Sequence, residues 1–232
     1  MLWYKGWLET RFRVLFVLGC FLFPVGFFLR HIDPPLPRAV VENLLNSLAL
    51  FLLFIPVLLA GAGINTQRIL FGTYKGLHGS VYFTLSLPVS RLRMLATRAG
   101  LGMLETVGVL AALSCGAWFM LPAPRVYLTC SDLFAYWVTV SICVSAFYAL
   151  SVFLATFLGD EEQMGASIVL ILILLMLSTA VSVPSSLNIW RAIGQSSRLI
   201  THTFPWASMG ISLGGAAILF LAAMRVVQTH EY

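Results

Sequence analysis

Long apolar stretches with few charged residues divide this chain along most of its length. A helix that crosses a bilayer needs roughly 20 mostly apolar residues, and six segments of the sequence meet that requirement. They cover residues 14–31, 39–63, 94–121, 133–158, 164–183 and 206–227. The strict apolar and polar alternation of a membrane barrel is absent from the sequence. The pattern therefore predicts an all-α fold, a polytopic bundle of six transmembrane helices that forms a single domain over residues 1–232.

The composition excludes the common water-soluble classes. Of the 232 residues, 59% are hydrophobic and 10% are charged, whereas a soluble domain is about 45–50% apolar and about 25% charged. A soluble fold of this length has too much surface to bury so many apolar side chains. A soluble enzyme, a nucleic-acid-binding domain and a disordered regulator are excluded, and the net charge of +5 does not indicate a nucleic-acid partner.

The distribution of Lys and Arg predicts the orientation of the bundle. Cytoplasmic loops of membrane proteins carry an excess of these residues, and an N-terminus placed inside puts nine of the fourteen on the cytoplasmic side. These nine are Lys5, Arg11, Arg13, Arg68, Lys75, Arg91, Arg93, Arg98 and Arg225. We expect a multi-pass protein of the cytoplasmic (inner) membrane with both termini in the cytoplasm.

Residues 1–13 mix aromatic and basic side chains and are expected to form an amphipathic interface helix. Trp3, Tyr4 and Trp7 are residue types that prefer the level of the lipid headgroups. This helix either anchors the first span in membrane lipid or, in addition, contacts a cytoplasmic partner.

Two connecting segments are unusual for plain loops. Residues 64–93 form the longest and most basic cytoplasmic connection, and Pro88 suits the first turn of a short helix. The alternative is a basic loop held at the anionic leaflet. The external segment 184–205 is too polar to span and too apolar for a free loop, so we expect short helices in the outer leaflet. They either cap an exit path or pack on the bundle.

The connection before the third span carries a resemblance to a known family. Gly76 and Gly79, then the stretch of residues 83–91 that includes Leu-Pro-Val-Ser-Arg, then Arg98 and Glu105 resemble the membrane subunit of ATP-binding-cassette transporters of the type-2 exporter class. The resemblance implies that two six-span units pair, as a homodimer or with a close paralogue, and that two ATP-binding cassette subunits dock on the cytoplasmic side. The phosphate-cradling Gly-x-x-x-x-Gly-Lys-Ser/Thr motif is absent from the sequence. We therefore expect a transport subunit that is not itself an enzyme and binds no cofactor, with ATP and Mg used by the partner.

The resemblance also implies which residues serve coupling and transport. Contact with the ATPase falls on Leu85, Ser86, Leu87, Pro88, Val89, Ser90, Arg91 and Arg93, and on Asp160, Glu161 and Glu162. The acidic run has the alternative of being a solvated turn. A substrate path lined by the second and fifth spans has as its polar points Asn43, Asn46, Ser47, Ser178, Thr179 and Ser182. Its mainly apolar lining favours a hydrophobic or amphipathic cargo.

Glu105 is the one acidic residue well inside a predicted span. An ionisable group at such a position is costly and indicates a functional site. The structural alternative is an ion pair with Arg11, Arg13 or Arg98 that locks helices together, and the functional one is gating or cation handling.

Gly210 and Gly214 form a Gly-x-x-x-Gly motif in the sixth span. Such a motif permits close helix approach, and we expect packing within the chain, with a dimer seam as the alternative.

Two other functions compete with the exporter. An ion-coupled secondary transporter would need intramembrane carboxylates and an internal repeat, and a non-transporting membrane anchor subunit would need neither. Metal and catalytic sites are not expected, since His31, His78, His202 and His230 fall in loops or the tail.

Overall fold

The computed structural model describes residues 2–29, 51–60, 90–120, 129–158, 160–181, 184, 187–194 and 203–229. Over these ranges the chain forms α-helices and no strands, which confirms the predicted all-α class for the described part. The helices are α1 (Leu2–Leu29), α3 (Ile55–Ala60), α5 (Arg91–Met120), α7 (Cys130–Ala155), α8 (Asp160–Ala180), α9 (Ile189–Ile193) and α11 (Trp206–Thr229).

Three of these helices contain segments long and apolar enough to cross a membrane: Leu92–Gly116, Cys130–Ala155 and Trp206–Thr229. They coincide with the spans expected at residues 94–121, 133–158 and 206–227. A shorter apolar segment, Glu162–Ser178 in α8, falls in the expected fifth span. Length and composition of these helices indicate a membrane protein, and the full count of six spans stays a prediction.

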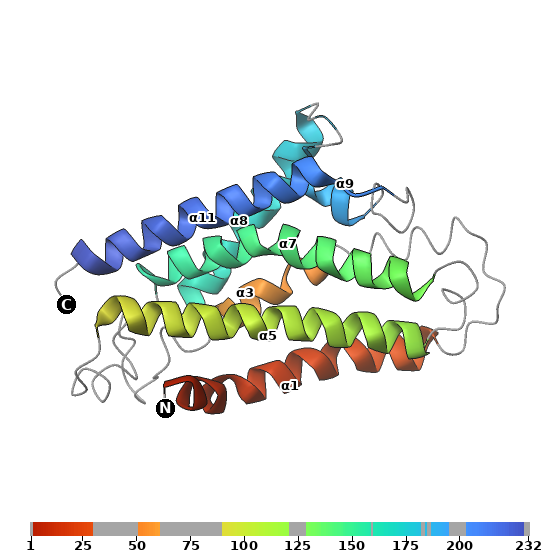
Figure 1. Cartoon of the computed structure of the whole chain (residues 1–232), viewed down its shortest axis with the longest axis horizontal. Helices are drawn as coiled ribbons and strands as arrows, with labels where there is room; N and C mark the ends of the chain where they lie inside the picture. Colours follow the sequence, from red (N-terminus) through yellow and green to blue (C-terminus); the bar gives the residue numbers. More distant parts are fainter. Residues whose placement is uncertain are drawn as a thin grey trace.

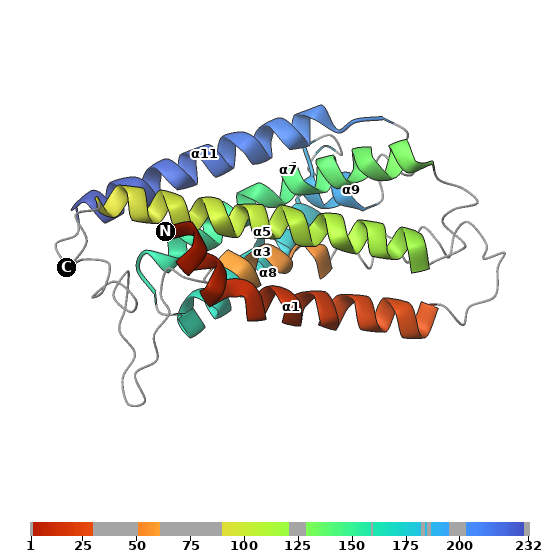
Figure 2. The ribbon, with the colours of Figure 1, turned by 60° about the horizontal axis from the view of Figure 1, so that its bottom comes forward.

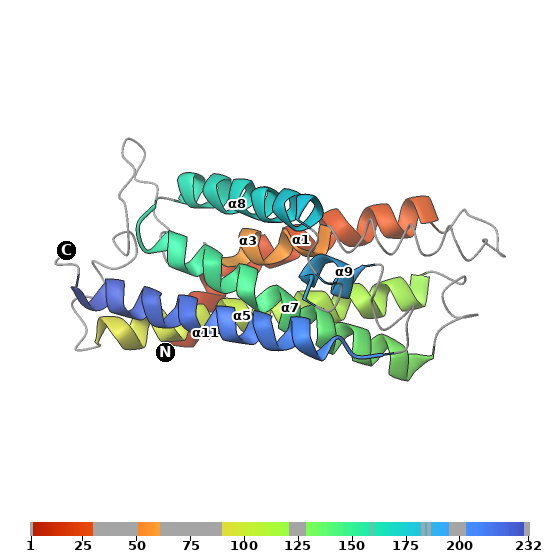
Figure 3. The same ribbon diagram turned by 90° about the horizontal axis from the view of Figure 1, so that it is seen from above.

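The long helices lie side by side along one direction (Figure 1). α1 and α5 run the same way, and α7 and α11 run the opposite way. The first residues of α1, α5 and α8 and the last residues of α7 and α11 therefore lie at one end of the bundle. α3 and α7 lie between α8 on one side and α5 and α11 on the other (Figure 3). Both described chain ends thus lie at the same end of the molecule.

α7 is the central helix of the bundle. It packs against α5, α8 and α11, and its buried residues, from Ala135 to Ala155, lie on several faces. Its N-terminus is fixed by a capping box: the Asp132 amide donates to Thr129 Oγ1 and the Thr129 amide donates to Asp132 Oδ2, both at 3.3 Å. Reciprocal bonds of this kind satisfy amides that the first helical turn leaves unpaired.

Much of the outer surface is apolar. On α8 the exposed side chains include Val169, Leu172, Ile173, Leu174, Met176 and Leu177. Soluble monomers rarely expose contiguous apolar patches of this extent. The face is suited to lipid.

α1 is a single helix through the expected interface segment and most of the expected first span. Figure 2 shows that its first turns are inclined towards α5 and that the remainder runs along the bundle. The structure therefore joins the described parts of the interface segment and the first span, Leu2–Leu29, into one bent helix.

Candidate functional site

Polar side chains are buried where α5 packs against α1 and against α7. They are Thr10 on α1, Arg98, Glu105 and Thr106 on α5, and Tyr148 on α7. We call this group the α5 polar cluster. Arg98 and Glu105 are seven residues apart, which places them two turns apart on one face of α5.

Glu105 lies near the middle of the apolar segment of α5. It follows Leu92 by thirteen residues and precedes Gly116 by eleven, which puts it about 20 Å along the segment at 1.5 Å per residue. Its side chain is only 7% exposed. The Glu105 carboxylate is therefore buried among the described helices, at the middle of this apolar segment.

The partner of Glu105 is a hydroxyl group. Thr10 Oγ1 donates a hydrogen bond to Glu105 Oε1, and Thr10 is itself 2% exposed. Glu105 Oε2 is buried and has no hydrogen-bond partner within the described residues. The contact thus joins α1 to α5 through Thr10, a residue that was not among the partners considered from sequence, which were Arg11, Arg13 and Arg98. One of them, Arg11, is exposed and lies over the Phe12 ring, with its Cζ 4.8 Å from the ring centroid.

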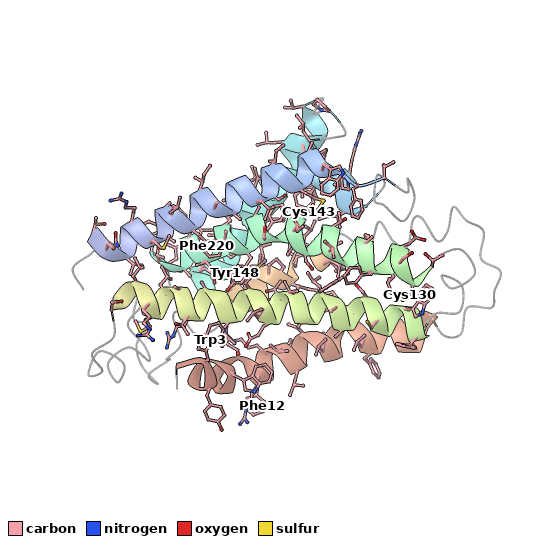
Figure 4. All side chains as sticks on the ribbon, viewed as in Figure 1. Trp3, Phe12, Cys130, Cys143, Tyr148 and Phe220 are labelled. Atoms are coloured by element: carbon pink, nitrogen blue, oxygen red, sulfur yellow. The ribbon has the colours of Figure 1, made fainter. Side chains whose placement is uncertain are left out.

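The Thr10–Glu105 contact belongs to a parallel register between α1 and α5. Before it along both helices, the Trp3 ring comes within 3.5 Å of the place that a Cβ on Gly100 would occupy. After it, the Leu22 side chain covers Gly116. Trp3 lies between the two helices in Figure 4, and Phe12 lies on the side of α1 away from α5.

Tyr148 joins α7 to α5 and to α11. Its hydroxyl donates to the Ala99 carbonyl oxygen at 2.8 Å, and its ring centroid lies 6.2 Å from that of Phe220 on α11 (Figure 4). A Cβ on Gly102 would collide with the Tyr148 hydroxyl. Glycine at residue 102 therefore allows the close approach of α7 to α5.

The residues expected to contact an ATPase are described in part. Leu85, Ser86, Leu87, Pro88 and Val89 lie outside the described residues. Ser90 is exposed and its hydroxyl accepts from the Arg93 amide at 3.3 Å, so it caps the helix that begins at Arg91. Arg93 is exposed.

The acidic run opens α8, which begins at Asp160 and includes Glu161. Glu162 is exposed. The first turn of α8 lies at the same end of the bundle as the first turn of α5 (Figure 1). The described parts of the two segments implied by the family resemblance, the start of α5 and the start of α8, therefore share one end of the bundle.

The expected polar points of a substrate path fall mainly on undescribed positions. Asn43, Asn46, Ser47 and Ser182 lie outside the described residues, and Thr179 is placed only by the backbone of α8. Ser178 is half-buried and donates to the Leu175 carbonyl oxygen of its own helix at 2.8 Å. Its hydroxyl is thus bonded within α8.

Among the described residues, the glycine pair of α11 does not make the packing expected from sequence. Gly210 and Gly214 are exposed, and a Cβ on either would meet no described atom within 4 Å. The close face of α11 carries Ser208, Ser212 and Ala216, and it is packed against α7. Packing within the described bundle uses the opposite face because residues two positions apart point about 200° apart on a helix.

Sequence reasoning missed Thr10, Gly102 and Tyr148. Each is unremarkable in sequence: Thr10 stands among charged residues, and the other two stand in apolar runs. The one available signal was the spacing of Arg98, Gly102 and Glu105, which share a face of α5.

A search of known protein families, curated proteins and solved structures gave no match to this chain.

Proposed function

We propose that this chain is the membrane permease subunit of an ATP-driven exporter of the ATP-binding-cassette type. It pairs with a second copy or a close paralogue in the cytoplasmic membrane, with both termini in the cytoplasm. A separate subunit binds ATP and Mg, and the cargo is hydrophobic or amphipathic. The first turns of α1 rest in the lipid headgroups.

The observation that carries this proposal is the shared end of the bundle. The first turns of α5 and α8 and the described ends of α1 and α11 all lie there (Figure 1). A partner that docks at this end could reach both segments that the family resemblance assigns to coupling. α5 is a continuous helix of 30 residues, about 45 Å long at 1.5 Å per residue. A displacement of its first turn would therefore move the whole helix, including Glu105, as far as the other end of the bundle.

The charges at this end of the bundle favour one orientation of a docking partner. The segment before and within the first turn of α5 is basic, with Arg91 and Arg93, and the first turn of α8 is acidic. Opposite charges on neighbouring segments orient a partner during encounter and suppress wrong orientations.

The proposal is tested by purifying the chain with the ATP-binding subunit encoded nearest to its gene. We expect a stable complex in mild detergent whose ATPase rate differs from that of the isolated ATPase. Arg91→Glu is expected to abolish that difference. Arg191→Glu is the matched control, since it reverses an exposed arginine on α9, away from this end of the bundle (Figure 1), and it should leave the change in ATPase rate intact.

Absence of a complex with any ATP-binding subunit would contradict the proposal. The burial of Glu105 in the middle of an apolar segment favours an ion-coupled secondary transporter as the second candidate. Proteoliposomes that contain this chain alone would then take up cargo in response to an imposed proton or sodium gradient. Glu105→Gln would abolish that uptake, and a chain without any uptake would fit the anchor subunit.

A further inference from the structure

Aromatic and cationic side chains on the first three turns of α1 are open to the surroundings of the bundle. Tyr4 and Phe12 are each 68% exposed, Trp7 is 42% exposed, and Arg11 is exposed as well. Figure 4 places Phe12 on the side of α1 away from α5. Tyr4, Trp7 and Arg11 follow one another at intervals of three and four residues, so they lie along one side of the helix. We call these four residues the aromatic–arginine face.

The exposed side chains of α1 become purely apolar directly after this face. Leu15 is 62% exposed and Phe16 is 70% exposed, and Leu15 follows Arg11 by one turn on the same side of the helix. Trp, Tyr and Arg combine an apolar body with a polar tip and suit the headgroup level, whereas Leu and Phe suit the acyl chains. Side chains on a helix lean towards its N-terminus, which directs Arg11 to the headgroup side of this boundary.

The guanidinium of Arg11 is placed on an aromatic ring. Its Cζ lies 4.8 Å from the centroid of the Phe12 ring, which is a cation–π arrangement. Stacking of this kind uses the flat face of the guanidinium. Its N–H donors lie in the plane of the group, at its edge, where they match two oxygens of one phosphate. Arg11 therefore has the chemistry of a phosphate-binding residue at the level of the headgroups.

The charge at this end of the bundle favours anionic over zwitterionic phospholipid. Residues 2–13 include three basic residues and one acidic residue. Arg93 at the start of α5 and Arg225 near the end of α11 are exposed at the same end (Figure 1). A zwitterionic headgroup carries its own amine beside the phosphate, whereas an anionic headgroup leaves that negative charge uncompensated. Basic residues close to a membrane surface attract anionic lipid for this reason.

We propose that the aromatic–arginine face is a binding surface for anionic phospholipid. Arg11 binds the headgroup phosphate, and Tyr4, Trp7 and Phe12 lie between the headgroups and the first carbons of the acyl chains. The partner is membrane lipid and not a protein. The proposal rests on the placement of the first turns of α1 in the headgroups, and it does not depend on an ATPase partner.

The test measures the lipid preference beside this face in the full-length chain. The four native cysteines are replaced by alanine, and a nitrobenzoxadiazole fluorophore on Leu15→Cys reports on lipid one turn from Arg11. The chain is reconstituted in vesicles of phosphatidylcholine and phosphatidylglycerol, and one or the other lipid carries a nitroxide that quenches the fluorophore. Comparison of the two mixtures gives the binding constant of phosphatidylglycerol relative to phosphatidylcholine. The same fluorophore on Ile218→Cys, which is 68% exposed on α11, is the reporter at a distance.

We expect phosphatidylglycerol to be preferred beside Leu15→Cys, and Arg11→Gln to lower this preference about fivefold, which corresponds to about 1 kcal/mol for one basic residue near the membrane surface. Arg11→Lys keeps the charge and should retain most of the preference. Arg191→Gln is the matched control, because it removes an exposed arginine of α9, away from this end of the bundle (Figure 1). It should leave the preference unchanged, as should Arg11→Gln at the Ile218→Cys reporter.

Four outcomes would overturn the proposal. Equal quenching by both lipids at Leu15→Cys would show that the face lies in lipid without selecting a headgroup, and the membrane placement of α1 would stand. An equal loss in Arg11→Lys would show that charge is not the cause. An equal loss at the Ile218→Cys reporter would assign the effect to the charge of the whole protein. Quenching at Ile218→Cys alone would show that protein covers the face, and it would also contradict the placement of α1 in the headgroups.

Discussion

The hydroxyl of Tyr148 donates a hydrogen bond to the Ala99 carbonyl oxygen at 2.8 Å. This bond crosses from the central helix α7 to α5, at a level where α5 has a glycine, Gly102, in place of a side chain. Both partners are buried. The pair fixes the distance between the two helices next to Glu105.

Tyr148→Phe should lower the free energy of unfolding by about 1 kcal/mol, since it removes one buried hydrogen bond and little apolar area. The measurement is unfolding of the purified protein in mixed micelles with increasing denaturing detergent. Tyr4→Phe is the control because Tyr4 is 68% exposed. An equal loss of unfolding free energy in both variants would contradict a stabilising role of the Tyr148 hydrogen bond.

Gly102→Ala should destabilise the chain by about 1–3 kcal/mol, because its Cβ would collide with the Tyr148 hydroxyl and force the two helices apart. Gly108→Ala lies on the same helix with open space around its Cβ, and it should be neutral or stabilising by up to about 1 kcal/mol. Both are measured by the same unfolding assay. The double variant Gly102→Ala/Tyr148→Phe should recover part of the loss, and strict additivity would contradict the predicted collision.

Thr10→Val should destabilise the folded bundle by about 1–3 kcal/mol, the cost of leaving a buried acceptor without its donor. The substitution removes the donor to Glu105 Oε1, and Oε2 has no hydrogen-bond partner among the described residues. Glu105→Leu in the same background should remove most of the added cost, because the unpaired polar group is gone. A double-mutant cycle measures the coupling, and a coupling energy near zero would contradict an energetically significant contact.

Ala216→Leu should destabilise the packing of α11 by about 1–3 kcal/mol through overpacking. Ala216 is 6% exposed, and its neighbour Ala217 is exposed. Ala217→Leu is therefore a control with the same chemistry on the other side of the helix, and it should change stability little. Thermal unfolding of the two variants compares them directly, and a larger loss at Ala217 would reverse the assigned face of α11.

The positions of several helices could be predicted from sequence because that signal is local. Bilayer thickness sets the length of an apolar helix, and α5, α7 and α11 follow the expected spans within a few residues. Thr129 and Asp132 extend α7 to Cys130, before the expected first residue Leu133, because the capping box satisfies the first amides. A capping box can be read in sequence, since its residues are three positions apart.

The partners of the buried polar residues could not be predicted in the same way. Thr10 and Glu105 are 95 positions apart, and their contact depends on the parallel register of α1 and α5. The sequence indicated that Glu105 needs a partner, and Arg11, Arg13 and Arg98 were equally possible candidates on sequence grounds. Packing of Trp3 on Gly100 and of Leu22 on Gly116 brings Thr10 to the carboxylate instead.

The sequence by itself determined the helical class, the apolar character that indicates a membrane protein, and the approximate limits of α5, α7 and α11, because these follow from the length and polarity of contiguous segments. Only the tertiary structure decided which face of each helix is turned inward. Gly210 and Gly214 lie on the face of α11 opposite to Ser208 and Ser212. The Gly-x-x-x-Gly motif alone does not indicate which of the two faces packs inside the bundle. The packing of α11 against α7 decides how α11 is rotated about its own axis. In the same way, the packing of α1 against α5 places Thr10 beside Glu105.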